Sequence, residues 1–264
     1  MTKAEIVTLP ETAMVTLWCR ASEAQRSDGI IDDPIAIRLL DSIDYDFSKF
    51  GRSTTRQDLA LRALAFDERT HRYLSEHPEA TVVALGEGLQ TSFWRLSAAG
   101  LGDRFRWLTV DLPPIIELRE RLLPHSPHIS SCAQSVLDFT WIDRVNPQDG
   151  VFVTAEGLLP YLEPQQALSL IGECARRFPG GQMMFDLPSK FQAFLARRRV
   201  WTTLRGGWPR TPFALSVREA AGLANAVPGI RNVHNLPVSR GRGPVVDQLL
   251  WPTVATLTLL EFGS

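Results

Sequence analysis

The feature that most constrains the fold of this chain is a glycine turn placed between two apolar segments. Residues 81–85 form an apolar run that leads directly into Gly86-Glu87-Gly88, and a second apolar run, residues 106–112, carries Asp111 near its end. A strand, a Gly-x-Gly turn, a helix and a second strand tipped by an acid together form the layout of a nucleotide-type cofactor site on a parallel α/β sheet. The glycines let the backbone approach a ligand, and the acid can accept both hydroxyls of a ribose.

The glycine turn alone leaves the ligand open. Position 91 is Thr, so the third glycine of the dinucleotide fingerprint is missing, which weakens the case for a pyrophosphate ligand. A Gly-x-Gly turn can also be purely structural in an α/β protein. The preceding strand, the following helix and Asp111 favour a cofactor role.

The remaining chain alternates between strand-like and helix-like segments after residue 80. Such alternation predicts an α/β fold with a mostly parallel, Rossmann-like sheet and right-handed crossovers. Two late strand-like segments joined by a short connection predict an antiparallel pair at one sheet edge. Strands are predicted at residues 81–85, 106–112, 128–136, 151–155, 182–187, 231–238 and 254–262, and helices at 91–99, 115–123 and 164–178.

The 264 residues are predicted to form one domain with four parts. Residues 1–78 read as an N-terminal helical cap, with a break at Asp32-Asp33-Pro34 and a second helical region at 56–76. Residues 79–187 form the cofactor-binding core, and residues 229–264 supply strands that complete the sheet. Residues 188–228 interrupt the alternation, and we expect this helical insertion to act as a substrate lid over the site.

Composition narrows the classes of partner. The formal net charge is −1, so no global field attracts nucleic acid or an anionic membrane. The three cysteines are widely spaced, and no run of about 18 apolar residues occurs, so neither a disulfide framework nor a membrane span is predicted. His125 and His128 lack acidic partners, and no metal site is predicted. We expect a cytoplasmic monomer or homodimer.

Several polar residues follow predicted strands and are candidates for ligand contact. Glu156 follows the apolar strand 151–155, and a carboxylate there is costly unless it binds a ligand or pairs with a basic residue. Tyr161 is a site candidate or a core aromatic. Asp138-Phe139 could bracket a purine, or Asp138 could cap a helix. For Arg20 and Arg62, surface salt bridges are the default interpretation.

Three segments in order carry a family resemblance: VVALGEGLQTSFWRL, WLTVDLPPIIELRERLL and VFVTAEGLLPYLEPQQA. Together they resemble the leucine carboxyl methyltransferase family, including its bacterial polyketide O-methyltransferase branch. The resemblance implies a class I methyltransferase that uses S-adenosyl-L-methionine. It implies that the glycines meet the methionyl part of the cofactor, that Asp111 holds the ribose, and that Glu156 lies near the amino group. The implied cofactor-binding residues are Arg62, Gly86, Gly88, Asp111, Leu112, Asp138, Phe139 and Glu156.

The chemistry of the acceptor favours a carboxylate. A free carboxyl group has a pKa near about 4 and is ionised at neutral pH without a general base, whereas a phenol near about 10 needs one. The sequence offers no evident Asp–His base pair. Tyr161 and Arg20 are the candidates for catalytic residues that hold the acceptor. Arg20 stands where protein-directed members of the family carry a lysine.

Four functions remain open at this point. The first is O-methylation of a carboxylate or hydroxyl on a small-molecule, polyketide-like metabolite. The second is methylation of a protein C-terminal carboxylate, and the third is a cofactor-binding regulator without catalysis. The fourth, a nicotinamide-dependent oxidoreductase, is disfavoured by the missing third glycine at position 91.

Overall fold

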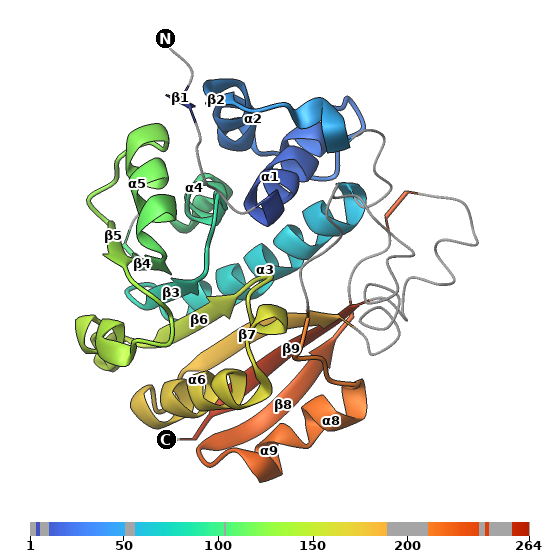
Figure 1. The fold of residues 1–264 in the computed structure, drawn as a ribbon. Coiled ribbons are helices and arrows are strands. Elements are labelled where there is room, and N and C mark those ends of the chain that lie inside the picture. Colours follow the sequence, from blue (N-terminus) through green and yellow to red (C-terminus); the bar gives the residue numbers. More distant parts are fainter. Residues whose placement is uncertain are drawn as a thin grey trace.

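The computed structural model describes residues 4–5, 11–50, 56–102, 104–188, 211–237, 241–242 and 255–263. Its centre is a seven-stranded sheet in the order β5-β4-β3-β6-β7-β9-β8 (Figure 1). β3 to β7 run parallel to one another, and β9 runs antiparallel to both β7 and β8. The strands are β3 (Thr81–Leu85), β4 (Arg106–Asp111), β5 (Ile129–Ala133), β6 (Val151–Ala155), β7 (Gln182–Pro188), β8 (Ile230–Leu236) and β9 (Ala255–Phe262).

This sheet confirms the predicted α/β fold, including the antiparallel pair at one edge. The chain order and the spatial order differ, because β9 inserts between β7 and β8. β5 is shorter than the predicted strand 128–136, since the chain after Ala133 turns toward a 3₁₀ helix, η3 (Phe139–Arg144). The order reverses at β3, whose neighbours β4 and β6 lie on opposite sides, and a ligand crevice is expected at such a point.

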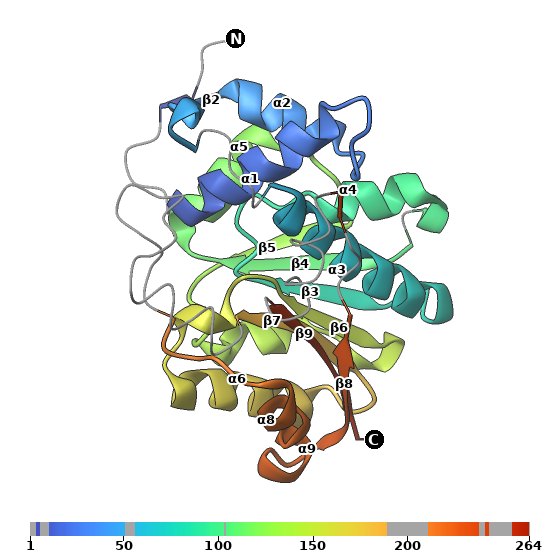
Figure 2. The same cartoon turned by 90° about the vertical axis from the view of Figure 1, so that its right-hand side faces the viewer.

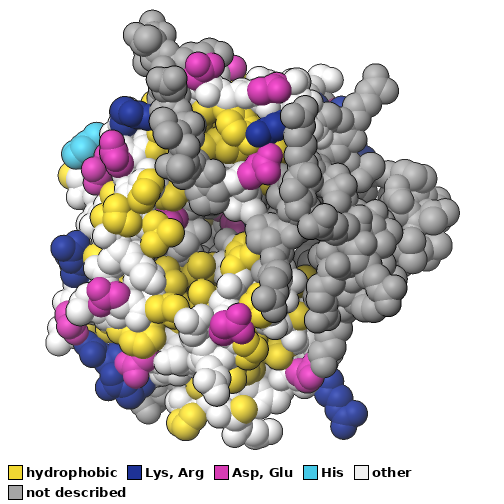
Figure 3. Space-filling view, in the orientation of Figure 1, with side chains coloured by type: hydrophobic (Ala, Val, Ile, Leu, Met, Phe, Trp, Pro, Cys, Tyr) yellow, Lys and Arg dark blue, Asp and Glu magenta, His cyan; other side chains and the backbone are white. Residues whose placement is uncertain are grey.

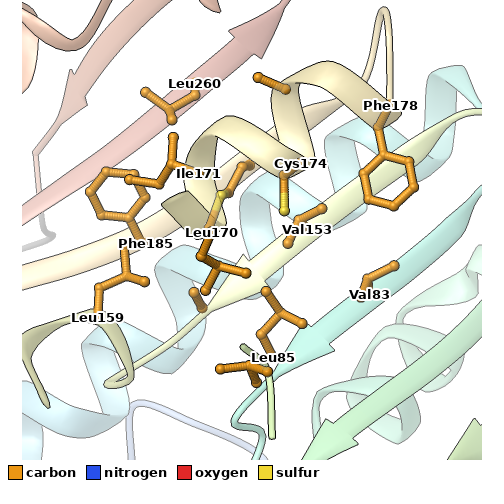
Figure 4. Close-up of a cluster of buried hydrophobic side chains, with 14 of the residues drawn as sticks. Val83, Leu85, Val153, Leu159, Leu170, Ile171, Cys174, Phe178, Phe185 and Leu260 are labelled. Atoms are coloured by element: carbon orange, nitrogen blue, oxygen red, sulfur yellow. The ribbon is translucent and has the colours of Figure 1, made fainter. Parts of the chain in front are cut away.

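Both faces of the central strands are buried, which explains their unbroken apolar sequences. All five residues of β3 and all five of β6 are buried. Val83, Leu85 and Val153 point to one face, where they pack with Leu170 and Cys174 of α6 (Pro164–Arg177) (Figure 4). Parallel strands covered by helices on both faces have this composition.

The opposite face is covered mainly by α3 (Arg56–Glu76) and α4 (Ser92–Leu96) (Figure 2). Phe66 and Phe93 from these helices pack with Val82 and Trp107 of the sheet. α4 is shorter than the predicted helix 91–99, because a π-helical turn, η2 (Ser97–Leu101), follows it and Gly100 adopts φ 93°. The predicted helical region 56–76 coincides with α3.

The N-terminal helices lie over one end of this sheet (Figure 1). α1 (Glu11–Ala24) packs on α2 (Pro34–Ser42) and on α3. Asp33 caps α2 through a hydrogen bond from the Ala36 amide, and Pro34 occupies the first turn, where its missing N–H is not needed. Short elements complete this region: β1 (Ala4–Glu5), β2 (Ile43–Asp44) and the 3₁₀ helix η1 (Phe47–Phe50).

The remaining connections matter mainly for their positions. α5 (Pro113–Leu122) follows β4, and the 3₁₀ helices η4 (Pro147–Asp149) and η5 (Leu159–Tyr161) flank β6. Residues 189–210 of the predicted lid lie outside the described residues, so the lid stays a prediction. Its later part contains α8 (Val217–Ala221) and α9 (Leu223–Ala226), which pack against β8. Within the described ranges, no helix is both long and apolar enough to cross a membrane.

Candidate active site

A cavity of about 490 Å³ lies at the carboxyl ends of β3, β4 and β6, between the glycine turn and helices α1 and α3. This volume is in the usual range for sites that enclose a small organic ligand, about 300–1,000 Å³. Hydrophobic side chains gather over the central part of the face seen in Figure 3, with single Asp and Glu side chains among them. Of the residues predicted from the sequence, the cavity lining includes Arg20, Arg62, Gly86, Gly88, Asp111, Leu112, Glu156 and Tyr161.

The glycine turn has the backbone conformation that its sequence predicts. Gly86 adopts φ +59° and Gly88 φ +58°, both in the left-handed region that favours glycine. A Cβ atom on Gly86 would also lie 2.8 Å from the Leu158 Cδ1 atom. Gly86 is therefore required both by its backbone conformation and by the close packing of Leu158 against the turn.

Asp111 closes the turn from the neighbouring strand. Its Oδ2 accepts a hydrogen bond from the Gly88 amide at 2.7 Å, and its Oδ1 accepts one from the Leu112 amide at 2.7 Å. Burial raises the pKa of this carboxyl group, while the two amides and Arg119 oppose the shift. Each carboxylate oxygen can accept more than one hydrogen bond, so both remain able to receive a hydroxyl of a vicinal diol.

Glu156 lies directly after β6 and is held by two side chains. Its Oε1 accepts from Arg62 Nε at 3.0 Å, and its Oε2 accepts from Gln90 Nε2 at 2.7 Å. Its side chain is 13% exposed and Arg62 is 16% exposed. The interpretation of Arg62 as a surface residue is therefore wrong, because α3 directs its guanidinium into the cavity.

A third strand end supplies an acid that the sequence analysis did not select. Asp186 in β7 accepts from Arg62 Nη1 at 3.0 Å and from the Gly157 amide at 2.6 Å. The rule that selected Asp111 and Glu156, an acid at the end of an apolar strand, applies equally to the MMFD segment that ends on Asp186. Arg62 thus bridges the carboxylates at the ends of β6 and β7.

Tyr161 borders the cavity at the end of η5. Burial raises the pKa of its hydroxyl to about 12, the charge of Arg62 opposes this shift, and Asp186 adds to it. The phenol therefore keeps its proton at neutral pH and can donate a hydrogen bond. Its predicted contact with an acceptor stays a prediction.

Arg20 is also buried, with 2% of its side chain exposed, so a surface salt bridge is wrong for it as well. It donates to the Leu89 carbonyl at 2.6 Å and to the Thr16 carbonyl at 3.2 Å. Its Nε lies 3.6 Å from Asp33 Oδ2. Two of its three nitrogens are therefore engaged with backbone that carries the glycine turn and α1.

Asp138 and Phe139 do not belong to the described cavity lining. The Asp138 side chain caps η3 by accepting from the Thr140 amide at 3.3 Å and from its hydroxyl at 2.8 Å. Phe139 is partly buried and packs against the core cluster that also contains Val83 and Val153. Their predicted contact with adenine stays a prediction, as does the predicted cofactor contact of Leu112, which is 52% exposed and lines the cavity.

Two buried ion clusters flank the glycine turn, and neither was predicted from the sequence. In the first, which we term the cap cluster, Arg95 of α4 contacts Asp33 at 2.6 Å and Asp67 at 2.6 Å. In the second, the loop cluster, Arg119 of α5 contacts Glu87 at 2.9 Å. Arg119 also donates to the Gly88 carbonyl at 2.8 Å and to the Gln90 carbonyl at 2.9 Å.

Comparison with known proteins decides the family. The sequence profile of the leucine carboxyl methyltransferases matches residues 13–175, which is more than half of the chain. The chain belongs to the leucine carboxyl methyltransferase family. Among its relatives, the tetracenomycin polyketide synthesis O-methyltransferase TcmP of Streptomyces glaucescens is 32% identical over 222 residues, covering 84% of this chain and 80% of that protein.

A fungal relative supports this membership, and a solved structure shares the fold. The S-adenosyl-L-methionine-dependent methyltransferase dpfgK of Gibberella zeae is 26% identical over 248 residues, covering 87% of this chain and 82% of that protein. The structure of a DUF574 family protein from Streptomyces avermitilis aligns with a TM-score of 0.63 at 12% identity, over 95% of this chain and 97% of that one. The fold is that of the class I methyltransferases.

This family member is a methyltransferase, and S-adenosyl-L-methionine is its cofactor. The cavity fits that ligand on two observations. The cavity volume of about 490 Å³ is in the range for a small organic ligand, and Asp111 in its lining has two oxygens that each keep an acceptor position for a ribose hydroxyl. Among the described residues, no group of three His, Cys, Asp or Glu side chains could hold a metal ion.

Proposed function

We propose that this methyltransferase transfers the methyl group to an oxygen of a small, polyketide-like acceptor, and that the oxygen belongs to a carboxylate. TcmP, the relative of Streptomyces glaucescens, is an O-methyltransferase of polyketide synthesis, which supports the oxygen acceptor and the metabolite class. The residues that line the cavity support a carboxylate as the acceptor.

The single observation that carries the carboxylate proposal is the lack of a free base in the described cavity lining. None of the described lining residues is His, Lys or Cys. The lining carboxylates Glu87, Asp111 and Glu156 all accept hydrogen bonds from the protein itself. An acceptor that is already ionised at neutral pH needs no proton removed, whereas a phenol does.

The bound cofactor supplies an activated methyl group, so the chain mainly has to orient the acceptor oxygen. We propose that the Tyr161 hydroxyl donates a hydrogen bond to the acceptor and that the Arg62 charge favours its anionic form. Arg20, expected to hold the acceptor, has two nitrogens bonded to the Thr16 and Leu89 carbonyls. Its proposed role is accordingly to fix the end of the glycine turn against α1.

The test compares matched acceptors that share one aromatic skeleton and carry either a carboxyl group or a phenol. Methyl transfer from labelled S-adenosyl-L-methionine is measured, and the product is then treated with mild alkali. A methyl ester releases labelled methanol under these conditions, whereas an aryl methyl ether is stable. Alkali-labile product on the carboxylic acid supports the proposal, and alkali-stable product on the phenol alone contradicts it.

Tyr161→Phe tests the proposed hydrogen bond to the acceptor. We expect kcat/KM to fall about 10- to 100-fold, since a hydrogen bond to a charged group contributes about 1.5–3 kcal/mol. The affinity for S-adenosylhomocysteine should stay unchanged because the variant alters the acceptor side. Equal kcat/KM in the two proteins would exclude the role of Tyr161, while leaving the class of acceptor to the previous experiment.

A further inference from the structure

Gln90 lies two residues after the glycine turn, and the proposed methyl-transfer chemistry assigns it no role. Its side chain is 7% exposed and borders the cavity. Its Nε2 donates to Glu156 Oε2 at 2.7 Å. Its Oε1 accepts from the Thr91 amide at 3.1 Å and from Arg95 Nη1 and Nη2 at 3.2 Å each.

The surrounding groups allow only one orientation of this amide. Arg95 can only donate hydrogen bonds, so the group that faces it must be the amide oxygen. The amide nitrogen then faces Glu156, which as a carboxylate can only accept. Gln90 therefore links the cap cluster, through Arg95, to the carboxylate at the end of β6.

Glu156 is consequently held at both oxygens. Arg62 fixes Oε1 from α3, and Gln90 fixes Oε2 from the glycine turn. A carboxylate oxygen has two acceptor positions, so each oxygen keeps one for a further donor. Because a neutral amide rather than a second cation occupies Oε2, the negative charge of Glu156 is neutralised by Arg62 on one side only.

We propose that Gln90 is a positioning residue that aims the Glu156 carboxylate at the ammonium group of the cofactor's methionyl end. Gln90 thereby selects ligands that carry this ammonium group. The inference depends on the cofactor role expected of Glu156, and it holds whichever acceptor is used. Its failure would leave the proposed acceptor chemistry untouched, because that chemistry is measured on the acceptor and not on cofactor affinity.

Calorimetry with two ligands tests the proposal on the full chain. S-Adenosylhomocysteine carries the amino-acid end, and 5′-methylthioadenosine lacks it. We expect Gln90→Met, which keeps the shape of the side chain but not its hydrogen bonds, to weaken S-adenosylhomocysteine binding about tenfold or more. The affinity of the same variant for 5′-methylthioadenosine should change less than about twofold, because the site for the adenosine part is unaltered.

A double-mutant cycle then asks whether Gln90 acts through Glu156. In a Glu156→Gln background, Gln90→Met should change S-adenosylhomocysteine affinity less than about twofold, because the group it positions is already altered. Equal losses for both ligands, or a full effect that persists in the Glu156→Gln background, would overturn the proposal.

Two further variants distinguish a selective loss of affinity from a folding defect. Gln90→Asn keeps the amide but is too short to reach Glu156, so it should reproduce the selective loss. Gln166→Met removes an exposed amide on α6, where Gln166 Oε1 accepts from the Glu163 amide at 3.1 Å, and it should leave both affinities unchanged. If Gln90→Asn binds both ligands as the unmodified chain does, the proposal is likewise overturned.

Discussion

The cap cluster and the loop cluster both contact residues 87–91, yet they join different parts of the molecule. The cap cluster connects α2 and α3 to α4 through Asp33, Asp67 and Arg95, and Thr91 in the turn donates to Asp33 at 2.6 Å. The loop cluster connects the turn to β4 and α5, because Glu87 accepts from Thr109 at 2.5 Å and pairs with Arg119. The cap cluster therefore ties the N-terminal helices to α4, and the loop cluster ties the glycine turn to β4 and α5.

One carboxyl group from each cluster, Asp33 and Glu87, responds differently to burial. For Asp33, burial opposes ionisation, but the charges of Arg95 and Arg20 and the Thr91 hydrogen bond outweigh it and lower the pKa. For Glu87, burial dominates and raises the pKa although Arg119, Thr109 and Trp107 oppose the shift. The charges of two arginines act on Asp33, whereas a single arginine charge acts on Glu87 and on Asp67 of the cap cluster, and burial raises the pKa of both.

Removing the Asp33 side chain should lower the free energy of unfolding more than any other change predicted below. Asp33→Ala leaves Arg95 and Arg20 with less compensation in a buried site, and breaking a buried pair typically costs about 3–5 kcal/mol. We expect a loss of that size in the free energy of unfolding, measured with urea. Asp41→Ala, an exposed acid in the same helix, is the matched control and should change it by less than about 0.5 kcal/mol. Similar values for the two variants would show that the cap cluster does not stabilise the chain.

Replacing Arg119 of the loop cluster by Lys should lower the free energy of unfolding by a smaller amount. Arg119→Lys keeps the charge but cannot serve Glu87, Gly88 and Gln90 together, since an ammonium lacks the planar fork of guanidinium. We expect a loss of about 1–3 kcal/mol in the free energy of unfolding and about tenfold weaker binding of S-adenosylhomocysteine. Arg121→Lys, on the exposed side of the same helix, should alter neither quantity. Unchanged ligand affinity in Arg119→Lys would separate the loop cluster from cofactor binding.

The dependence of stability on pH should have opposite signs for the two carboxyl groups. Asp33, with a lowered folded pKa, contributes stability above about pH 3.9 that is lost as the pH falls through its folded pKa. Glu87, with a raised folded pKa, makes the chain lose stability as the pH rises from about 4.3 toward that pKa. Each contributes at most about 1.4 kcal/mol per pH unit.

Urea unfolding of Asp33→Asn and Glu87→Gln across this pH range measures both slopes. Relative to the unmodified chain, Asp33→Asn should become less stable as the pH rises, and Glu87→Gln should become more stable. Slopes of the same sign would show that the charges facing the two groups do not differ as the distances indicate.

Asp138 should give the smallest effect, since it lies outside both clusters. If it accepts a hydrogen bond from the adenine amino group as predicted, Asp138→Ala should weaken S-adenosylhomocysteine binding about 2- to 10-fold. Asp143→Ala, an exposed acid in the same 3₁₀ helix, is the matched control for calorimetry. Equal affinity in all three proteins would leave Asp138 as a local cap of η3 only.

Much of the fold and part of the site could be predicted because they depend on local patterns. The apolar run 81–85 and the helical pattern 56–76 coincide with β3 and α3, since burial on one or both faces fixes the periodicity of each element. Gly86 and Gly88 need left-handed backbone, and that need is visible in the residue type alone. The boundaries of α4 and β5 were less predictable, because a π turn replaces the expected end of α4 and a bend and turn at residues 134–136 replace that of β5.

By itself the sequence determined the parallel α/β fold, the glycine turn and the acids that end successive strands, since these follow from side-chain periodicity and residue type. Only the tertiary structure decided which groups each of these side chains contacts. Arg20 and Arg62 became buried because α1 and α3 close over the strand ends. Asp186 met Gly157 because β6 and β7 pair in parallel, which places their carboxyl ends side by side. Contacts between residues far apart in sequence depend on this strand order, which no local pattern encodes.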